Sequence, residues 1–460
     1  MADAPGARDL GETIAAEATP PGRGGVSIVR LSGPMAFPLL AQLFRPLHGP
    51  SPSHRPRMAV FGEVLGEDGR LLDRGLAIAF PAPDSFTGED VAELHLHGAP
   101  HLPAEVLRLG EERGARRARP GEFSYRAFLN GKLSLLEAEA LDALTRCQTT
   151  VQADRTVNRG LNSGLASTLD ALSERLSVLQ ARAEASLDFP EDVQETPPKS
   201  LRDGLLLLRD RLDAFCADFD RSRPLRRGWR LTLAGRTNAG KSSLFNALLR
   251  RERALVSAEP GTTRDVLSET ISFMNMPLTL SDSAGGGAGD EPLDELAMRA
   301  ARQAARESDG VLYLYDASTG WEPADEAAAA SLSHTLVAIV ANKRDLCPRI
   351  PPFREENAPH LFLSALTGEG IDTLEETLAA WMRSSLPLES ECLFNERHRR
   401  CARAARNALD RSIEALEEGL SEEVALQGMR RAGASLDELQ GGGDPESLYD
   451  RIFSSFCVGK

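Results

Sequence analysis

A glycine-rich stretch, LTLAGRTNAGKSS, contains the spacing Gly235-x4-Gly240-Lys241-Ser242. It follows an apolar run and precedes SLFNALLR, which has the apolar spacing of a helix. In that context the backbone N–H groups of the loop can surround a β-phosphate, and a lysine can reach the β- and γ-phosphates. The Ser242 hydroxyl can bind Mg²⁺. The residues expected to bind phosphate or its metal are Asn238, Ala239, Gly240, Lys241, Ser242 and Ser243.

Two later segments have the residue types that complete a γ-phosphate site. Asp282-Ser-Ala-Gly285 ends the run PLTLSD, where Asp282 can hold a Mg²⁺-bound water and Gly285 can contact the γ-phosphate. In SAEPGTTRD (257–265), Thr263 fits the threonine that completes Mg²⁺ coordination, although a plain Pro-Gly turn is the alternative.

Two further segments have the residue types that recognise guanine. A carboxylate at Asp345 can accept hydrogen bonds from guanine N1–H and N2–H₂, which adenine does not offer in that arrangement. Lys343 can lie along the base plane, and the Ala365 N–H can reach guanine O6. The full segments are Asn342-Lys343-Arg-Asp345 and Ser364-Ala365-Leu366. The four motifs in this order predict GTP rather than ATP.

The segment after Gly285 has no side chain that could orient the attacking water. Gly286 stands where related GTPases have a glutamine, and Gly287 adds further backbone freedom. The nearest carboxylates are Glu291, Asp294 and Glu295. Another positive charge must also replace an arginine finger.

The elements that position these motifs read as alternating strands and helices. The expected strands are WRLTLAG (229–235), PLTLSD (277–282), GVLYLYD (310–316), TLVAIVAN (335–342) and LFLSA (361–365). This alternation predicts a doubly wound parallel sheet of the Ras-like P-loop type. Residues 1–121 contain VSIVRLSG, RGLAIAF and VAELHLHG between turn-forming residues, which predicts an α+β domain. Residues 122–222 and 384–460 have helical spacing, so a GTPase domain at 223–383 is expected to be inserted into an all-α domain.

Composition limits the class of protein. The chain has 460 residues with ordinary hydrophobic (42%) and charged (26%) fractions. Its net charge of −15 argues against a generic nucleic-acid binder. No apolar run is long enough to span a bilayer, and the N-terminus lacks the apolar core of a secretory signal. Six scattered cysteines without a C-x-x-C pair favour reduced thiols. We therefore expect a cytoplasmic protein without a membrane partner.

The termini, together with the GTPase motifs, resemble one family across nearly the whole chain. The matching stretches are ATPPGRGGVSIVRLSG, SFTGEDVAELHLHG, RPGEFSYRAFLNGKLSLLEAEA, GRTNAGKSSLFNALL, PGTTRD and RIFSSFCVGK. They resemble the MnmE (TrmE) tRNA-modification GTPases. The resemblance implies a folate-binding N-terminal domain that also forms the homodimer, a helical domain, and a G domain inserted into it. It also implies an FAD-dependent MnmG-like partner, with which such proteins modify C5 of the wobble uridine of certain tRNAs using a tetrahydrofolate one-carbon unit.

The resemblance further implies that K⁺ stimulates GTP hydrolysis. It also implies that Asp294, with Glu295 adjacent, stands where the family has a glutamate that assists hydrolysis, and either could serve. Asn238 would be one K⁺ ligand, with Ser257, Glu259 and Thr262 around the ion. Gly261, in the same PGTTRD loop, would contact the nucleotide. A monovalent cation beside the β- and γ-phosphates acts like an arginine finger. From the residue alone, Asn238 is as readily an ordinary polar member of the loop.

The resemblance also gives the C-terminal CVGK a role. In the family this motif reaches the folate site, so Cys457 would act in modification and Lys460 would contact 5-formyltetrahydrofolate or a related carrier. The implied folate ligands are Arg30, Glu93 and Lys132. The residues alone leave other interpretations open: Glu93 fits a solvated strand face, Lys132 a helix surface, and Cys457 a small hydrophobe or a poor prenylation site.

The sequence also leaves other functions and two weaker candidate sites open. An Era-like GTPase switch in ribosome assembly would need GTP but no folate, and a scaffold that binds nucleotide without turnover is a third reading. His95 and His97, with His101, could suggest a metal site, although a structural role is favoured. The basic stretch NERHRRCARAAR (395–406) is the best local candidate for a tRNA phosphate contact, with a solvated helix face as its alternative.

Overall fold

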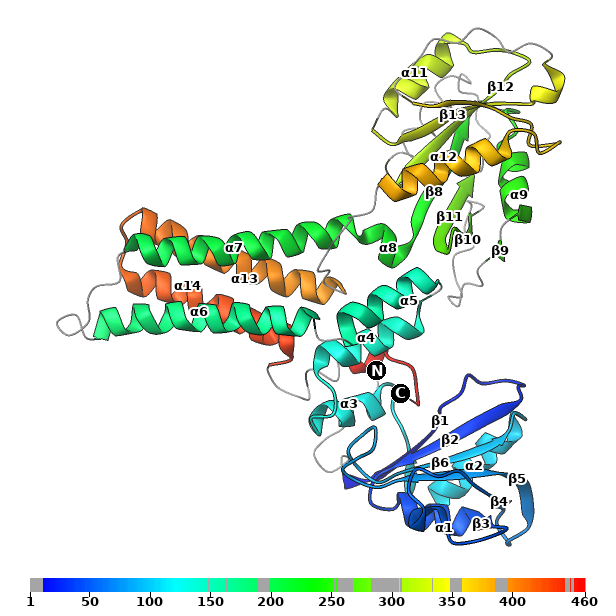
Figure 1. Cartoon of the computed structure of the whole chain (residues 1–460), viewed down its shortest axis with the longest axis vertical. Coiled ribbons are helices and arrows are strands. Elements are labelled where there is room, and N and C mark those ends of the chain that lie inside the picture. The colour runs from blue at the N-terminus through cyan, green and yellow to red at the C-terminus, as the bar shows by residue number, and fades with distance from the viewer. Residues whose placement is uncertain are drawn as a thin grey trace, which may run out of the picture. The chain divides into compact units, whose positions relative to one another are not determined.

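The computed structural model describes most of the chain (Figure 1). The described residues are 11–147, 149–161, 164–188, 198–251, 253–254, 268–282, 306, 308–332, 334–347, 358–384, 395–442, 447 and 451–459. They fall into two compact units. The first comprises Met1–Thr145, Asn158–Asp213 and Phe394–Lys460, and the second comprises Arg146–Val157 and Ala214–Leu393.

The first unit begins with a mixed seven-stranded sheet in the order β3-β4-β5-β6-β2-β1-β7. Its strands are β1 (Thr13–Glu17), β2 (Val26–Ser32), β3 (Phe44–Pro46), β4 (Val60–Leu65), β5 (Leu71–Phe80), β6 (Val91–His97) and β7 (Ala115–Arg117). Helices α1 (Ala36–Leu43) and α2 (His101–Glu112) bury their apolar residues in one core with the sheet, and a short 3₁₀ turn, η2 (Pro52–His54), joins β3 to β4.

The register of β2 and β6 decides which polar side chains meet. The two strands pair antiparallel, and Arg30 is directly opposite Glu93. Opposite residues project from the same face of a sheet, so these two side chains are neighbours. The alternating burial of VAELHLH in β6 places Leu94 and Leu96 in the core and Glu93 and His95 on the other face.

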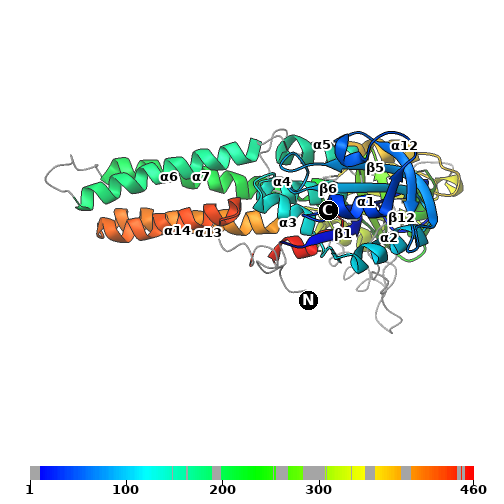
Figure 2. The ribbon, with the colours of Figure 1, turned by 90° about the horizontal axis from the view of Figure 1, so that it is seen from below.

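Helices form the rest of the first unit. They are α3 (Glu122–Leu129), α4 (Leu135–Thr145), α6 (Gly164–Asp188), the first part of α7 (Pro198–Arg221), α13 (Glu396–Glu417) and α14 (Glu422–Gln440). The last four lie side by side as a bundle (Figure 2). Leu165, Leu169, Leu172, Leu176 and Leu179 repeat at three- and four-residue spacing on α6 and are buried, as the packed stripe of a bundle helix requires.

The C-terminal segment packs against the helices that follow the sheet. Phe453, in the short 3₁₀ turn η6 (Phe453–Ser455), is completely buried with Phe456, Tyr125, Leu135 and Ala138. The Phe453 ring makes an edge contact with Tyr125, with 5.3 Å between ring centroids. The expectation that Phe453 and Phe456 pack together is confirmed, with 5.2 Å between their centroids.

The second unit contains another seven-stranded sheet, in the order β14-β13-β12-β8-β11-β10-β9. Its strands are β8 (Trp229–Gly235), β9 (Arg253–Ala254), β10 (Ser268–Phe273), β11 (Met276–Asp282), β12 (Gly310–Asp316), β13 (Leu336–Asn342) and β14 (His360–Phe362). Its helices are α5 (Thr150–Thr156), the π-helical turn η3 (Val157–Leu161) at the boundary with the first unit, α8 (Arg223–Arg227), α9 (Lys241–Arg251), α11 (Pro323–Ser331), η5 (Arg344–Leu346) and α12 (Ile371–Ser384). α9 and α12 share the main core with the sheet.

The expectation of an all-parallel sheet is wrong at one edge. Strands β8, β11, β12, β13 and β14 are parallel, but β10 pairs antiparallel with β11 and with β9. The cause is a two-residue hairpin turn at Met274 and Asn275, both of which have positive φ (50° and 60°). Two successive positive φ values give the turn whose twist suits a hairpin.

The composition predicts that the chain has no membrane-spanning helix and that its cysteines are reduced. Within the described residues, no helix is both long and apolar enough to cross a membrane. The cysteines described there, Cys147, Cys216, Cys347, Cys401 and Cys457, are free thiols.

Candidate functional site

The phosphate-loop motif lies between β8 and α9, at the carboxyl edge of the second sheet. The loop needs unusual backbone angles, with φ of 142° at Gly235, 62° at Asn238 and 87° at Gly240. A Cβ on Gly240 would lie 2.2 Å from the Asn342 side-chain nitrogen, so only glycine fits there. Any side chain at this position would force the loop and Asn342 apart.

Lys241 and Ser242 begin α9 and face the end of β11. The Lys241 ammonium donates to the carbonyls of Gly235 (2.9 Å) and Arg236 (2.8 Å). The Ser242 hydroxyl donates to Asp282 Oδ2 at 2.7 Å. Burial lowers the pKa of Lys241, and the Asp282 carboxylate partly opposes that shift. The structure thus brings a lysine, a hydroxyl and a carboxylate to the N-terminus of a helix, an arrangement suited to a phosphate with its divalent cation.

The guanine motifs meet the phosphate loop through Asn342. Its side-chain amide donates to the Ala239 carbonyl (2.9 Å) and accepts from the Ala365 N–H (3.0 Å). This buried side chain therefore ties the phosphate loop to the segment that contains Ser364 and Ala365. This direct link fixes the position of the predicted base-binding segment relative to the phosphate loop.

Asp345 and Lys343 are each held by a neighbour. Asp345 accepts from the Ser364 hydroxyl at 2.5 Å, and the Lys343 ammonium lies 2.7 Å from Asp316 at the end of β12. Although burial opposes it, Lys343 lowers the pKa of Asp316. Leu366 is 85% exposed, so only its backbone is available for a buried contact.

Several predicted residues lie outside the part of the chain that the structure describes. They are Ser257, Glu259, Gly261, Thr262, Thr263, Gly285, Asp294, Glu295 and Lys460. Ser243 is described and is exposed on the first turn of α9. Among described residues, no group of three or more histidine, cysteine or acidic side chains is arranged to hold a metal ion.

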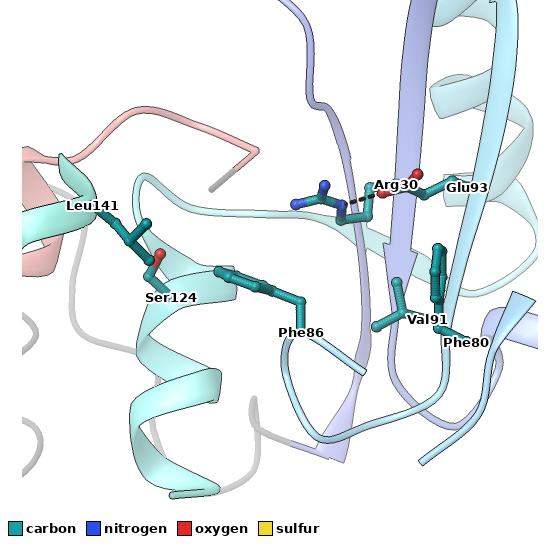
Figure 3. A pocket seen from close by; sticks show the side chains of 7 residues that line it. All are labelled: Arg30, Phe80, Phe86, Val91, Glu93, Ser124 and Leu141. Carbon is teal, nitrogen blue, oxygen red and sulfur yellow. Dashed lines mark hydrogen bonds and ion pairs between the residues drawn. The ribbon is translucent and has the colours of Figure 1, made fainter. Parts of the chain in front are cut away.

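The first unit has a pocket of about 380 Å³ on the polar face of its sheet (Figure 3). It is lined by Arg30, Phe80, Phe86, Val91, Glu93, Ser124 and Leu141. Arg30 and Glu93 extend into it from β2 and β6, while Ser124 and Leu141 reach it from α3 and α4 (Figure 3). A mostly apolar cavity with a few convergent polar groups is typical of a small-molecule site.

The polar end of this pocket is an ion pair with a histidine beside it. Arg30 Nε lies 2.9 Å from Glu93 Oε1, and His95 Nε2 lies 3.1 Å from Glu93 Oε2. The hydrogen bond with His95 and the charge of Arg30 hold the pKa of Glu93 below its ordinary value. The Arg30 guanidinium also lies over the Phe86 ring, 5.7 Å from its centroid. The pocket therefore offers an ionised carboxylate and aromatic surface together.

The C-terminal segment reaches the same place. Arg30 Nη1 donates to the Gly459 carbonyl at 3.3 Å, and the Gly121 N–H donates to the Cys457 carbonyl at 3.2 Å. Gly459 has a φ of 92°, and a Cβ there would lie 2.4 Å from the Glu17 carbonyl oxygen. The Cys457 side chain is exposed. The backbone of the tail at Cys457 and Gly459 therefore lies against Gly121 and the pocket residue Arg30.

Lys132 is not part of the pocket lining. It is exposed and lies beside Gly88, where an added Cβ would meet Lys132 Cγ at 3.3 Å. The pocket residues that sequence reasoning missed are Phe80, Phe86, Val91, Ser124 and Leu141. Phe86 and Ser124 stand in SFTGED and GEFSYR, two of the stretches that had already indicated the family.

The two weaker candidate sites have structural partners. His95 is bonded to Glu93 and His97 to Asp73 (2.7 Å), so the two histidines serve different carboxylates. In the basic stretch 395–406, Arg397 turns inward to the buried Glu139 (2.7 Å), and Arg406 pairs with Asp410 (2.7 Å). These contacts reduce the charge that the helix presents at its surface.

Comparison with known proteins covers both units. The family model "GTP-binding protein TrmE N-terminus" matches residues 13–132, and "MnmE helical domain" matches residues 135–457. The tRNA modification GTPase MnmE of Moorella thermoacetica is 37% identical over 467 residues, covering 98% of this chain and all (100%) of the relative. That of Pseudomonas paraeruginosa is 40% identical over 463 residues, covering 98% of this chain and 99% of the relative.

Among solved structures, Aquifex aeolicus Era bound to GDP·AlF₄⁻ is similar, with 26% identity and a TM-score of 0.25. The match covers 39% of this chain and 66% of that one. The similarity to the curated relatives extends over nearly the full length of each chain. The chain belongs to the MnmE family of tRNA modification GTPases.

Proposed function

We propose that this chain is a GTP hydrolase that takes part in modifying C5 of the wobble uridine of certain tRNAs. The observation that carries the proposal is the contact between the tail and the pocket, Arg30 to the Gly459 carbonyl. A nucleotide switch alone has no need for a tail that bonds to Arg30 of an apolar pocket and carries an exposed cysteine, Cys457, two residues before that bond. Nucleotide turnover in the second unit would drive changes in the first, through the helical domain.

In the nucleotide site, Lys241 would bind the β- and γ-phosphates, and Ser242 and Thr263 would hold Mg²⁺, with Asp282 binding one of its waters. The contact between Ser242 and Asp282 supports this assignment. Asp294 or Glu295 would help to orient the attacking water. The G domain, residues 223–383, would be inserted between the two helical segments 122–222 and 384–460.

Potassium would supply the missing positive charge. Asn238, Ser257, Glu259 and Thr262 would surround K⁺ beside the phosphates, and Gly261 would contact the nucleotide. Asn238 lies in the described phosphate loop, three residues before Lys241, so its side-chain oxygen is available close to the proposed phosphate site. We expect faster GTP hydrolysis in KCl than in NaCl at equal ionic strength, and equal rates would exclude this role for K⁺.

The pocket of the first unit fits a tetrahydrofolate such as 5-formyltetrahydrofolate. Glu93 can accept hydrogen bonds from an amino-pyrimidine edge, Phe80 and Phe86 offer apolar surface to a flat ring, and Arg30 can pair with a carboxylate or formyl oxygen. When bound, the folate would supply the one-carbon unit. Lys132 and Lys460 would contact the outer part of the ligand. A homodimer and an FAD-dependent MnmG-like protein complete the proposed cytoplasmic assembly on tRNA.

Guanine selectivity should depend on Asp345. The Asp345→Asn variant keeps an acceptor for Ser364 but replaces a second acceptor with a donor. We expect its GTP affinity to fall roughly 10- to 100-fold, because hydrogen bonds to a charged group are lost. Xanthosine triphosphate (XTP) has a carbonyl where guanine has the amino group. It should therefore bind to the Asp345→Asn variant more tightly than it binds to the parent protein. Competition with a fluorescent nucleotide measures the affinities for GTP and XTP. If the variant keeps the parent's preference for GTP over ATP and XTP, Asp345 does not recognise guanine.

The modification half of the proposal depends on Cys457. We expect Cys457→Ser to bind 5-formyltetrahydrofolate and hydrolyse GTP like the parent, but to leave the wobble uridine unmodified when the FAD-dependent partner and tRNA are present. The reason is that a serine hydroxyl keeps the size of the thiol but not its nucleophilicity at neutral pH. Mass spectrometry of digested tRNA measures the product.

A second tail residue serves as a structural comparison for that experiment. Val458 is 52% exposed beside Cys457, so Val458→Ala should retain modification. Full modification by Cys457→Ser would limit the thiol to packing. Failure of the parent to bind the folate would exclude the pocket as a one-carbon site and leave a guanine-nucleotide switch.

A further inference from the structure

The Arg236 side chain runs from the phosphate loop to the start of α11. Arg236 is the second residue of the loop that begins at Gly235. Its Nε lies 3.1 Å from Asp325 Oδ1, and its Nη1 lies 2.5 Å from Glu322 Oε1. Its Nη2 donates to the Gly320 carbonyl at 2.8 Å. Three groups from one short segment therefore hold a single guanidinium.

The carboxylate that receives Arg236 is itself fixed. Asp325 is completely buried. Its Oδ1 accepts from the Tyr313 hydroxyl in β12 (2.9 Å), and its Oδ2 accepts from the Glu322 N–H (2.9 Å). The second bond is half of a capping box at the N-terminus of α11. Because residues of β12 and of the α11 N-terminus both bond to Asp325, its carboxylate has little freedom to move, and it fixes the position of the Arg236 side chain.

The backbone of the same arginine touches the phosphate-binding lysine. Lys241 Nζ donates to the Arg236 carbonyl at 2.8 Å and to the Gly235 carbonyl at 2.9 Å. Arg236 is thus tied to α11 through its side chain and to Lys241 through its carbonyl. A shift of the arginine would move one of the two acceptors that orient the ammonium.

We infer that Arg236, held by Asp325 and Glu322, is a positioning residue that orients Lys241 for the phosphates. Its two carboxylate partners neutralise its guanidinium, so its part is to fix the loop and not to bind phosphate. The inference rests on the proposed nucleotide site. It adds a link from that site to α11, an element with none of the four GTP motifs.

The Arg236–Asp325 ion pair could stabilise the fold only, or it could also position Lys241, and the two roles predict different effects of mutation. Loss of a structural pair lowers the unfolding midpoint but leaves nucleotide affinity unchanged once the protein is folded. Loss of a positioning pair weakens affinity, and removal of either partner has the same consequence. A double-mutant cycle read out on nucleotide binding separates the two.

The experiment titrates a fluorescent GTP analogue and GDP into the full-length chain with Mg²⁺, using parent, Arg236→Met, Asp325→Asn and the double variant. We expect each single variant to raise Kd about tenfold and the double variant to raise it no further. Arg236→Lys, which keeps the charge but cannot reach all three partners, should lose about threefold. Circular dichroism and the thermal midpoint establish that each variant is folded.

Arg251 offers a matched control in the same unit. It lies in the last turn of α9 and pairs with Asp372 (2.5 Å) and Glu375 (3.3 Å), away from the loop carbonyls. Arg251→Met should change Kd less than about twofold. The inference is overturned if folded Arg236→Met binds nucleotide within twofold of the parent, or if the two single effects add. If Arg236→Met does not fold, the inference is overturned when Arg236→Lys binds nucleotide within twofold of the parent. Absence of GTP binding by the parent would instead overturn the proposed function.

Discussion

Replacement of Lys241 by alanine is expected to lower kcat/KM for GTP roughly 10²- to 10³-fold, the range seen when one preorganised charge is removed from a transition state. Lys241 is buried at the start of α9, and its ammonium is aimed by the carbonyls of Gly235 and Arg236. No neighbouring side chain in the described part of the loop occupies the same position. Release of inorganic phosphate, measured in KCl under saturating Mg²⁺, provides the rate.

The same helix supplies the control for that variant. Arg250 is exposed at the opposite end of α9, so Arg250→Ala removes a positive charge without touching the loop. It should keep the parent rate within about twofold. If folded Lys241→Ala hydrolyses GTP at the parent rate, the phosphate-loop assignment is wrong. Full tRNA modification by a Lys241→Ala variant that cannot hydrolyse GTP would separate turnover from modification and refute the proposed coupling.

The strands around the nucleotide were predictable because their signals are local. GVLYLYD and WRLTLAG are apolar runs bounded by polar residues, and they form β12 and β8 with the expected limits. The edge hairpin was not predictable in the same way. Met274 and Asn275 take the positive φ values that usually call for Asn-Gly, so the turn had no strong signal in the residues. Strand β10, which precedes it, was therefore missed.

The candidate pocket shows the limit of reasoning from residue types. Arg30 and Glu93 are 63 positions apart, and their contact depends on the register of β2 against β6. Alternation along β6 places Glu93 on the polar face but says nothing about what lies opposite. The resemblance of the termini to a family pointed to this pair, whereas spacing alone did not. Ser124 and Leu141 come from helices that only the folded chain brings to the same cavity.

A buried charge cluster joins the pocket-bearing helix α4 to the beginning of α13. Glu139 Oε1 accepts from Asn395 (2.8 Å) and Arg397 (2.9 Å). Glu139 Oε2 accepts from Arg397 (2.7 Å) and lies 2.5 Å from His398 Nε2. Arg397 also donates to the carbonyls of Glu438 and Leu439, near the end of α14. Glu139 therefore joins α4 to α13, and Arg397 extends the link to α14. Glu139 lies two positions before the pocket residue Leu141.

Removal of that carboxylate should destabilise the first unit strongly. Glu139→Gln keeps the shape of the side chain but leaves the Arg397 guanidinium without its buried anion, which typically costs about 3–5 kcal/mol. The exposed pair Glu184–Arg430, 2.7 Å apart between α6 and α14, is the matched control. Glu184→Gln should cost less than about 1 kcal/mol, since solvent screens an exposed pair.

Urea unfolding can assign the loss of stability to one unit. The chain has three tryptophans, Trp229, Trp321 and Trp381, and all belong to the second unit. Glu139→Gln should lower the midpoint of the circular dichroism signal from the first unit and leave the tryptophan fluorescence transition in place. Equal shifts of both signals would mean that the cluster stabilises the whole chain as one cooperative body, and no shift of either would show that it contributes nothing.

The stability difference between the parent and Glu139→Gln should depend on pH if it comes from the charge of Glu139. Although burial alone would raise it, His398 and Arg397 hold the pKa of the Glu139 carboxyl at about 2, against an ordinary value of 4.5. A carboxyl with a lowered folded pKa contributes stability that is fully present above its unfolded pKa and is lost as pH falls toward the folded one. The parent should therefore exceed Glu139→Gln by its full margin at about pH 5.5, and the margin should shrink progressively as the pH falls below about 4.5. A margin that stays constant down to pH 3 would mean that the glutamate acts through its shape and hydrogen bonds, and that its charge is not what joins α4 to the bundle.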